Sequence, residues 1–84
     1  MKVEKILEAV MEKTNMSKAQ LGRAVGIEQE KRPSDVINKR MKQKNISVNV
    51  LNEMLAKMGY TLAVVPAGTL LNEEKGEYEV TADE

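Results

Sequence analysis

Apolar residues recur at helical spacing in four stretches of the chain. The first stretch predicts a helix that ends near Thr14, with its apolar residues at i, i+3, i+4, i+7 and i+8. This apolar face consists of Val3, Ile6, Leu7, Val10 and Met11. In the second stretch, Leu21, Ala24 and Val25 are expected to face inward. Gly26 should end this helix, because glycine readily adopts the left-handed conformation.

The start of the second helix carries several independent signals. Ser17 is a good N-cap residue, and Gln20 three positions later completes a capping box. Met16 and Leu21 have the spacing of a hydrophobic staple around the same cap. Together these residues predict a helix that begins directly after Ser17.

Two further helices are predicted downstream. Pro33 or Ser34 should open the third, which runs to about Gln43, because proline suits the first turn of a helix. Its apolar residues are Val36, Ile37 and Met41. The fourth is expected to be capped by Ser47 and ended by Gly59. Its buried stripe should be Val48, Leu51, Met54, Leu55 and Met58.

The pattern changes after the fourth helix. Residues 60–65 are rich in strand-forming side chains and are closed by Pro66, so they predict a strand. Residues 76–80 alternate like an edge strand, and the last residues, 81–84, are expected to be disordered. The predicted fold is mostly α, with four to five helices and a short C-terminal strand or hairpin. Residues 1–66 form the domain and residues 67–84 an acidic extension.

Composition narrows the chemistry that the chain can support. Its 84 residues suffice for one domain, and they include no cysteine and no histidine. The commonest metal ligands and the usual general base are therefore missing, so we expect no enzyme, no metal and no cofactor. No apolar run approaches the roughly 20 residues that span a bilayer. The acidic, helical beginning does not resemble a signal peptide, so a cytoplasmic protein without membrane contact is expected.

Charge is distributed unevenly although the formal net charge is zero. Six basic residues and one acidic residue lie between Lys31 and Lys44, whereas six acidic residues and one basic residue lie between Ala67 and Glu84. A basic middle and an acidic tail suggest charged partners. The alternative is two ordinary solvated segments.

Two short helices joined by a glycine-bearing turn are typical of a helix-turn-helix, whose second helix enters the DNA major groove. The outward face of that predicted helix carries candidate base contacts at Asp35, Asn38, Lys39 and Lys42. Asn38 can pair with adenine, and the two lysines can donate to guanine or to phosphate. Asp35 can accept from cytosine or simply favour the positive end of the helix.

Candidate contacts to the DNA backbone surround this face. They are Ser17, Lys18, Lys31, Arg32, Arg40 and Lys44. Such contacts set affinity without reading sequence. Each has a structural alternative: a polar helix face is normally just solvated, Ser17 can act only as a cap, and Arg40 can lie over the core.

The run from Met16 to Ile27 resembles the Cro/repressor-like (XRE-type) helix-turn-helix family. The matching positions are Met16, Ser17, Leu21, Gly22, Gly26 and Ile27. Gly22 stands where the family usually has alanine, a small residue that lets the two helices approach. The run from Asn45 to Tyr60 is similar to the family's following helix, and the resemblance covers about Val3 to Val65. The chain departs from the family in a longer turn around Glu28–Arg32, which leaves the register of the recognition helix open.

The resemblance implies a lambda-repressor-like domain that acts as a homodimer on pseudo-palindromic DNA, as a small transcriptional regulator of the phage-repressor or antitoxin type. Independently, the apolar segment 60–65 has little else to pair with. It should form a hairpin with residues 76–80 or pair across a dimer axis, because a lone hairpin is marginal in water. Tyr60, Leu62 and Val64 are therefore the candidate dimer contacts.

A second function remains open at this point. The neutral net charge and acidic tail also suit a protein-interaction module that keeps the fold without binding DNA. Two roles for the tail are then open: binding a protein partner, or lying on the basic segment and inhibiting it. An enzyme would need a cluster of carboxylates in a pocket, whereas Glu73, Glu74, Glu77 and Glu79 resemble a solvated tail.

Overall fold

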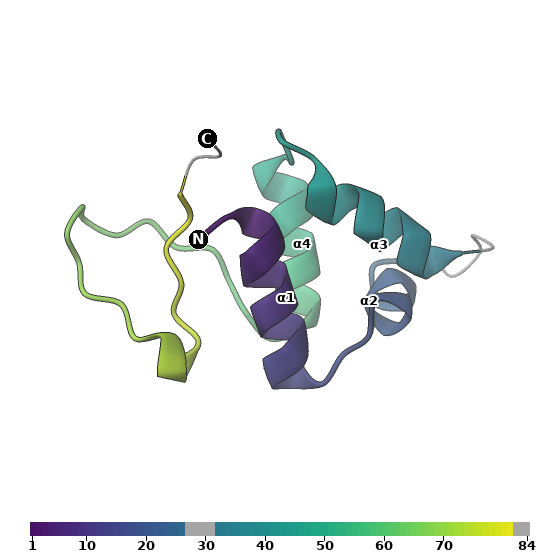
Figure 1. Cartoon of the computed structure of the whole chain (residues 1–84), viewed down its shortest axis with the longest axis horizontal. Coiled ribbons are helices and arrows are strands. Elements are labelled where there is room, and N and C mark those ends of the chain that lie inside the picture. Colours follow the sequence, from purple (N-terminus) through teal and green to yellow (C-terminus); the bar gives the residue numbers. More distant parts are fainter. Residues whose placement is uncertain (27–31, 82–84) are drawn as a thin grey trace.

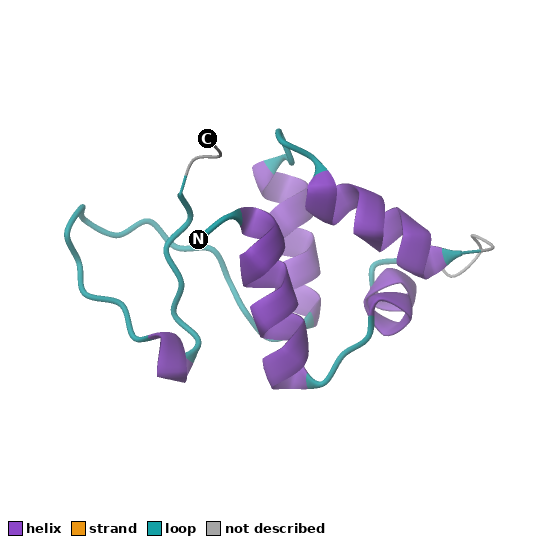
Figure 2. Ribbon diagram, viewed as in Figure 1, coloured by secondary structure: helices purple, strands orange, loops and turns teal. Residues whose placement is uncertain are grey.

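Four α-helices form the body of the computed structural model, which describes residues 1–26 and 32–81 (Figure 1). The helices are α1 (Val3–Thr14), α2 (Lys18–Ala24), α3 (Pro33–Lys42) and α4 (Val48–Lys57), followed by a short 3₁₀ helix, η1 (Glu73–Lys75). Figure 2 shows no strand among the described residues. The prediction of a mostly α fold is confirmed at the level of a small all-α domain.

The helix starts lie where their capping residues predict. The Ser17 side chain accepts a hydrogen bond from the Gln20 amide at 3.1 Å, and the Ser17 amide donates to the Gln20 side chain at 2.8 Å. This reciprocal pair is the predicted capping box. At α4, Ser47 Oγ accepts from the Val50 amide at 3.1 Å. Both caps satisfy amides that a helix start otherwise leaves without partners.

The core is built from aliphatic side chains and methionine, contributed by all four helices. Its buried members are Ile6, Leu7, Val10, Met11, Leu21, Ile37, Met41, Leu51, Met54, Leu55 and Met58. An aliphatic core follows from a composition with only two aromatic residues. Methionine fills irregular gaps between helices, which explains why four of the six methionines lie in this cluster.

Two residues expected to face inward lie outside the core. Ala24 is exposed at the end of α2, and Val48 is 71% exposed at the start of α4. Both occupy a terminal turn, where a helix extends beyond the neighbours that cover its middle. The periodic pattern alone does not reveal how far those neighbours reach.

The predicted strands at 60–65 and 76–80 are wrong for this structure. Backbone hydrogen bonds do not join the two segments in the described part of the chain. Instead, the N-terminal ammonium of Met1 donates to the Glu79 carbonyl at 2.7 Å, and the Thr81 amide donates to the Met1 carbonyl at 2.9 Å. The Leu62 amide donates to Asn52 Oδ1 at 3.3 Å. In this structure, the backbone of each limb of the predicted hairpin thus bonds to another part of the chain.

The segment after α4 nevertheless packs against the helices. Tyr60, Leu62 and Tyr78 lie partly buried against the core. Lys13 Nζ donates to the carbonyls of Glu73 and Glu74 at 2.8 and 3.0 Å, which attaches η1 to the end of α1. Residues 61–72 extend at the opposite end of the molecule from α2 (Figure 1). In the described ranges, every helix is too short or too polar to cross a membrane.

Candidate nucleic-acid interface

The candidate interface is built on α2 and α3, which form the most extensive contact between any two helices. Gly22 of α2 lies directly against Pro33, the first residue of α3. A Cβ added at Gly22 would lie 2.6 Å from Pro33 Cβ and 3.0 Å from the Pro33 carbonyl oxygen. The absence of a side chain at Gly22 therefore allows the two helices to approach, as expected for a small residue at this position.

The connection between these helices begins at a left-handed glycine. Gly26 has φ +87°, and its amide donates to the Arg23 carbonyl at 3.1 Å. This conformation ends α2 as the sequence predicts, because glycine adopts it without steric cost. The candidate backbone contact Lys31 lies outside the described residues, as does most of the lengthened turn. The residues on both sides of this turn are described. The position of α3 relative to α2 is therefore defined by the contact between Gly22 and Pro33.

Three of the four candidate base contacts are exposed on α3. Asp35, Lys39 and Lys42 are exposed, whereas Asn38 is half-buried. On the inner side of the same helix, Ile37 and Met41 are buried in the core. Their burial fixes the rotation of α3, so that its polar residues face away from the helical core.

Asn38 is connected to the beginning of α2. Lys18 Nζ donates a hydrogen bond to Asn38 Oδ1 at 2.8 Å, in a partly buried position. The sequence pattern predicts a phosphate contact for Lys18 and a base contact for Asn38, and it does not indicate a contact between the two. Its formation depends on how α2 and α3 cross, which no local sequence signal specifies.

Asp35 is paired within its own helix start. Its carboxylate lies 3.5 Å from Arg32 Nη1, and both side chains are mostly exposed. Asp35 also lies in the first turn of α3, where a negative charge is favourable. Arg32 and Asp35, both predicted to contact DNA, thus pair with each other. Asp35 therefore has a structural role at the start of α3 that does not require contact with a base.

The remaining candidate backbone contacts differ in accessibility. Lys44 and Ser17 are exposed, although Ser17 Oγ is already used in the cap of α2. Arg40 is half-buried, and its Nη1 atom is buried with no hydrogen-bond partner among the described residues. This matches the alternative in which Arg40 lies over the core, and it leaves one nitrogen of the guanidinium without a partner in the described part of the chain.

The candidate dimer contacts divide into two groups. Tyr60 and Leu62 are half-buried against the protein's own core, whereas Val64 is fully exposed. Val65 and Leu70 are also exposed, and residues 61–71 contain no charged side chain. The exposed apolar surface therefore includes Val64 and continues along the loop to Leu70, whereas Tyr60 and Leu62 pack against the core.

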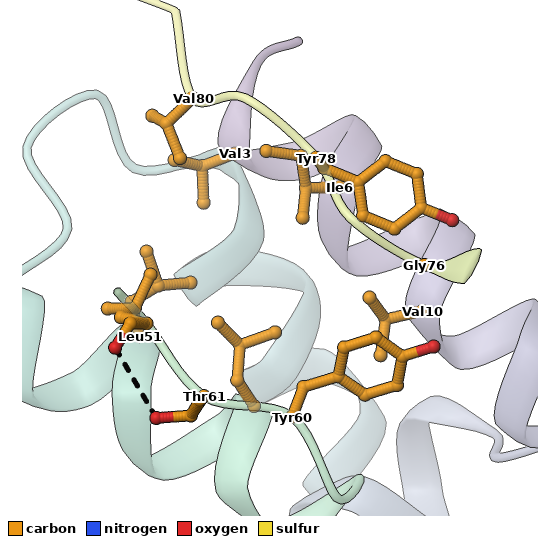
Figure 3. Close-up of a pocket in the computed structure, with 11 residues that line it drawn as sticks. Val3, Ile6, Val10, Leu51, Tyr60, Thr61, Gly76, Tyr78 and Val80 are labelled. Carbon is orange, nitrogen blue, oxygen red and sulfur yellow. Dashed lines mark hydrogen bonds between the residues drawn. The ribbon is translucent and has the colours of Figure 1, made fainter. Parts of the chain in front are cut away.

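A small apolar cavity lies between this C-terminal segment and the helices. It has a volume of about 70 Å³, and Tyr60, Gly76 and Tyr78 border it opposite residues of α1 and α4 (Figure 3). Its lining carries no carboxylate, amine or guanidinium group. The described residues also contain no cluster of three acidic side chains placed to hold a metal ion. The cavity offers packing space and no obvious catalytic chemistry.

Among the described residues, the acidic tail forms no ion pair with α3, although Val80 and Thr81 line the same hollow as Lys42 and Lys44 at the end of that helix. The ion pairs among the described residues are Lys5–Glu8 and Arg32–Asp35, and neither involves an acid of the tail. Lys13 binds backbone carbonyls of η1 rather than its carboxylates. Through residue 81, the tail therefore gives no support to inhibition by direct pairing with the basic segment.

No family model, curated protein or solved structure shows a significant match to this chain. The arrangement of side chains on α2 and α3 is thus the basis for any functional assignment.

Proposed function

We propose that the chain binds double-stranded DNA sequence-specifically, with α3 in the major groove, and acts as a small transcriptional regulator with a lambda-repressor-like helix-turn-helix fold. The observation that carries this proposal is the exposed polar face of α3, held outward by the burial of Ile37 and Met41. A major groove admits a helix, and Lys39 and Lys42 can reach base edges or phosphates from that face.

The local charge supports the same proposal. Residues 32–44 carry five basic side chains and one acidic side chain, and that acid is paired with Arg32. Basic side chains around a recognition helix contact phosphates and release counterions, which gives affinity independent of sequence. The chain lacks histidine and cysteine, so we propose binding rather than catalysis as its role.

We also propose that the DNA-binding form is a homodimer. The exposed residues Val64, Val65 and Leu70 lie in the uncharged stretch 61–71, and the chain has no formal net charge that would repel a second copy. Because Tyr60 and Leu62 pack in their own protomer, the dimer contact shifts to the exposed part of the loop, with Val64 as its retained member. A two-fold dimer would bind a palindrome.

A protein-interaction module is the second candidate function. The same exposed apolar loop favours it, since such a surface can dock on another protein without any DNA. In that case a partner would contact residues 63–71, and the face of α3 would be solvated surface. The acidic tail is a further candidate contact for a protein partner.

Selection from a random duplex library separates these functions. The full chain is incubated with the library at low and moderate salt, and the bound fraction is sequenced. We expect an enriched palindrome, with half-sites separated by about one helical turn or a multiple of it, and weaker binding at higher salt. Absence of both enrichment and salt-dependent binding would reject the DNA proposal and favour a protein partner.

A further inference from the structure

We infer that Lys18 is a positioning residue that fixes the side-chain amide of Asn38, so that α3 presents a hydrogen-bond donor at this position. This inference rests on the proposed function, because the donor matters only if α3 faces base edges. It assigns Lys18 a role in sequence preference, whereas the sequence alone suggests only a phosphate contact.

The chemistry of the pair determines which way the amide points. A lysine ammonium has three donors and no acceptor, so the atom of Asn38 that faces Lys18 must be the oxygen. Lys18 Nζ lies 2.8 Å from Asn38 Oδ1, within the range of a strong hydrogen bond to a charged donor. The contact is partly buried, which reduces competition from water. With Oδ1 held by Lys18, the Asn38 NH₂ group is left to make other contacts.

The two residues belong to different helices, so their hydrogen bond depends on the packing of α2 against α3. Lys18 is the first residue of α2, and Asn38 lies in the middle of α3. The close approach of Gly22 and Pro33 brings these helices together. The orientation of the amide is therefore set before any ligand arrives.

A fixed NH₂ donor discriminates between bases in the major groove. Adenine offers N7, guanine offers N7 and O6, and thymine offers O4 as acceptors, whereas cytosine offers a donor. Oδ1 has a second lone pair, so adenine can additionally donate its N6 hydrogen to it. The base opposite Asn38 should therefore be one that offers an acceptor, with adenine favoured because it can make both hydrogen bonds, and cytosine disfavoured.

Replacement of Lys18 tests this role directly. Lys18→Met keeps an unbranched apolar stem and removes the ammonium, which releases the amide to rotate. We expect the preference for adenine over cytosine to fall by about tenfold at a single position of the selected site, the effect expected for one good base contact. Any loss of a phosphate contact by Lys18 would lower affinity uniformly across sequences, so it is separable from this local effect.

Two further variants complete the experiment. Lys57→Met removes an exposed lysine from the end of α4 and serves as the matched control, with no change in sequence preference expected. Asn38→Asp retains an acceptor for Lys18 but has no donor, so the preference should move toward cytosine. Circular dichroism of each variant establishes that the helices remain folded.

The outcomes distinguish the inference from the function on which it rests. If the wild-type chain selects a site and Lys18→Met selects the same bases with equal discrimination, the inference is wrong and the proposed function stands. If the wild-type chain selects no site at all, the proposed function is wrong and the inference is rejected with it. Loss of discrimination confined to one position in Lys18→Met, with Lys57→Met unchanged, supports the inference.

Discussion

At the scale of single residues, the contact between Gly22 and Pro33 decides how α2 meets α3. A Cβ at Gly22 would approach Pro33 Cβ to 2.6 Å, a distance that real Cβ atoms essentially never show. We expect Gly22→Ala to lower the free energy of unfolding by about 1–3 kcal/mol, the usual cost of overpacking. Urea denaturation followed by circular dichroism measures this change.

A double-mutant cycle with Pro33→Gly provides the control for this prediction. Removing the side chain of Pro33 relieves the closest clash but leaves its carbonyl oxygen 3.0 Å from the added Cβ. The double variant should therefore be more stable than the sum of the two single effects predicts. Strict additivity would show that the helices do not meet at this point.

Arg40 provides a second test at the residue scale. Its Nη1 atom is buried and has no hydrogen-bond partner within residues 1–26 and 32–81, and burying a polar group without a partner costs free energy. We expect Arg40→Met to leave the free energy of unfolding unchanged or to raise it by up to about 1–3 kcal/mol. Lys39→Met, at an exposed position of the same helix, should change stability by no more than about 0.5 kcal/mol. A clear destabilisation by Arg40→Met would show that this guanidinium is satisfied in solution.

At the scale of elements, the capping residues govern where helices start. Ser17→Ala should lower the free energy of unfolding by about 1 kcal/mol, because it removes the acceptor for the Gln20 amide. In α2, only seven residues long, we expect this loss to appear as faster hydrogen exchange throughout the helix. Ser47→Ala, at the start of α4, is the matched control. It should lower the free energy of unfolding by a similar amount, but the faster hydrogen exchange should appear in α4. Equal exchange of α2 in both variants would contradict a local role for the Ser17 cap.

The sequence predicts elements well where the signal is local. Ser17, Gln20 and Gly26 specify both ends of α2, and helical spacing identifies most of the core. The segments at 60–65 and 76–80 were predicted as strands because strand-forming side chains dominate them, whereas their backbones bond to Asn52 and Met1. The Lys18–Asn38 contact was missed for the same reason, since it depends on partners distant in sequence. The sequence pattern is therefore enough to place four candidate residues on α3. Their hydrogen-bond partners are known only from the structure.

At the scale of the whole molecule, we expect the C-terminal segment to stabilise the helical core against which it packs. Tyr78 packs against the core beside the small apolar cavity. Gly76 is buried against the Tyr60 ring, and a Cβ added at Gly76 would lie 2.6 Å from the Tyr60 hydroxyl oxygen. We expect Tyr78→Ala to lower the free energy of unfolding by roughly 1–3 kcal/mol, less than for a fully buried aromatic residue because Tyr78 is half-buried. Thermal or urea unfolding measures the change.

Glu79→Ala is the matched control for the tail. The Glu79 side chain is exposed, and only its backbone carbonyl bonds to Met1, so this substitution should be nearly neutral. A tail that is detached in solution would give the opposite pattern, with Tyr78→Ala as harmless as Glu79→Ala. The comparison therefore tests whether residues 73–81 are part of the folded unit.

The central claim is that the exposed face of α3 binds DNA, and the salt dependence of binding tests it most directly. Fluorescence anisotropy would follow the wild-type chain and a Lys39→Gln/Lys42→Gln variant on the selected duplex across a range of salt concentrations. The variant should bind more weakly, and its slope of log affinity against log salt should be shallower by about 0.9 for each lysine that contacts phosphate. A Lys5→Gln/Lys57→Gln variant, altered on α1 and α4, should match the wild type. Equal affinity and slope for the wild type and the α3 variant would contradict the account.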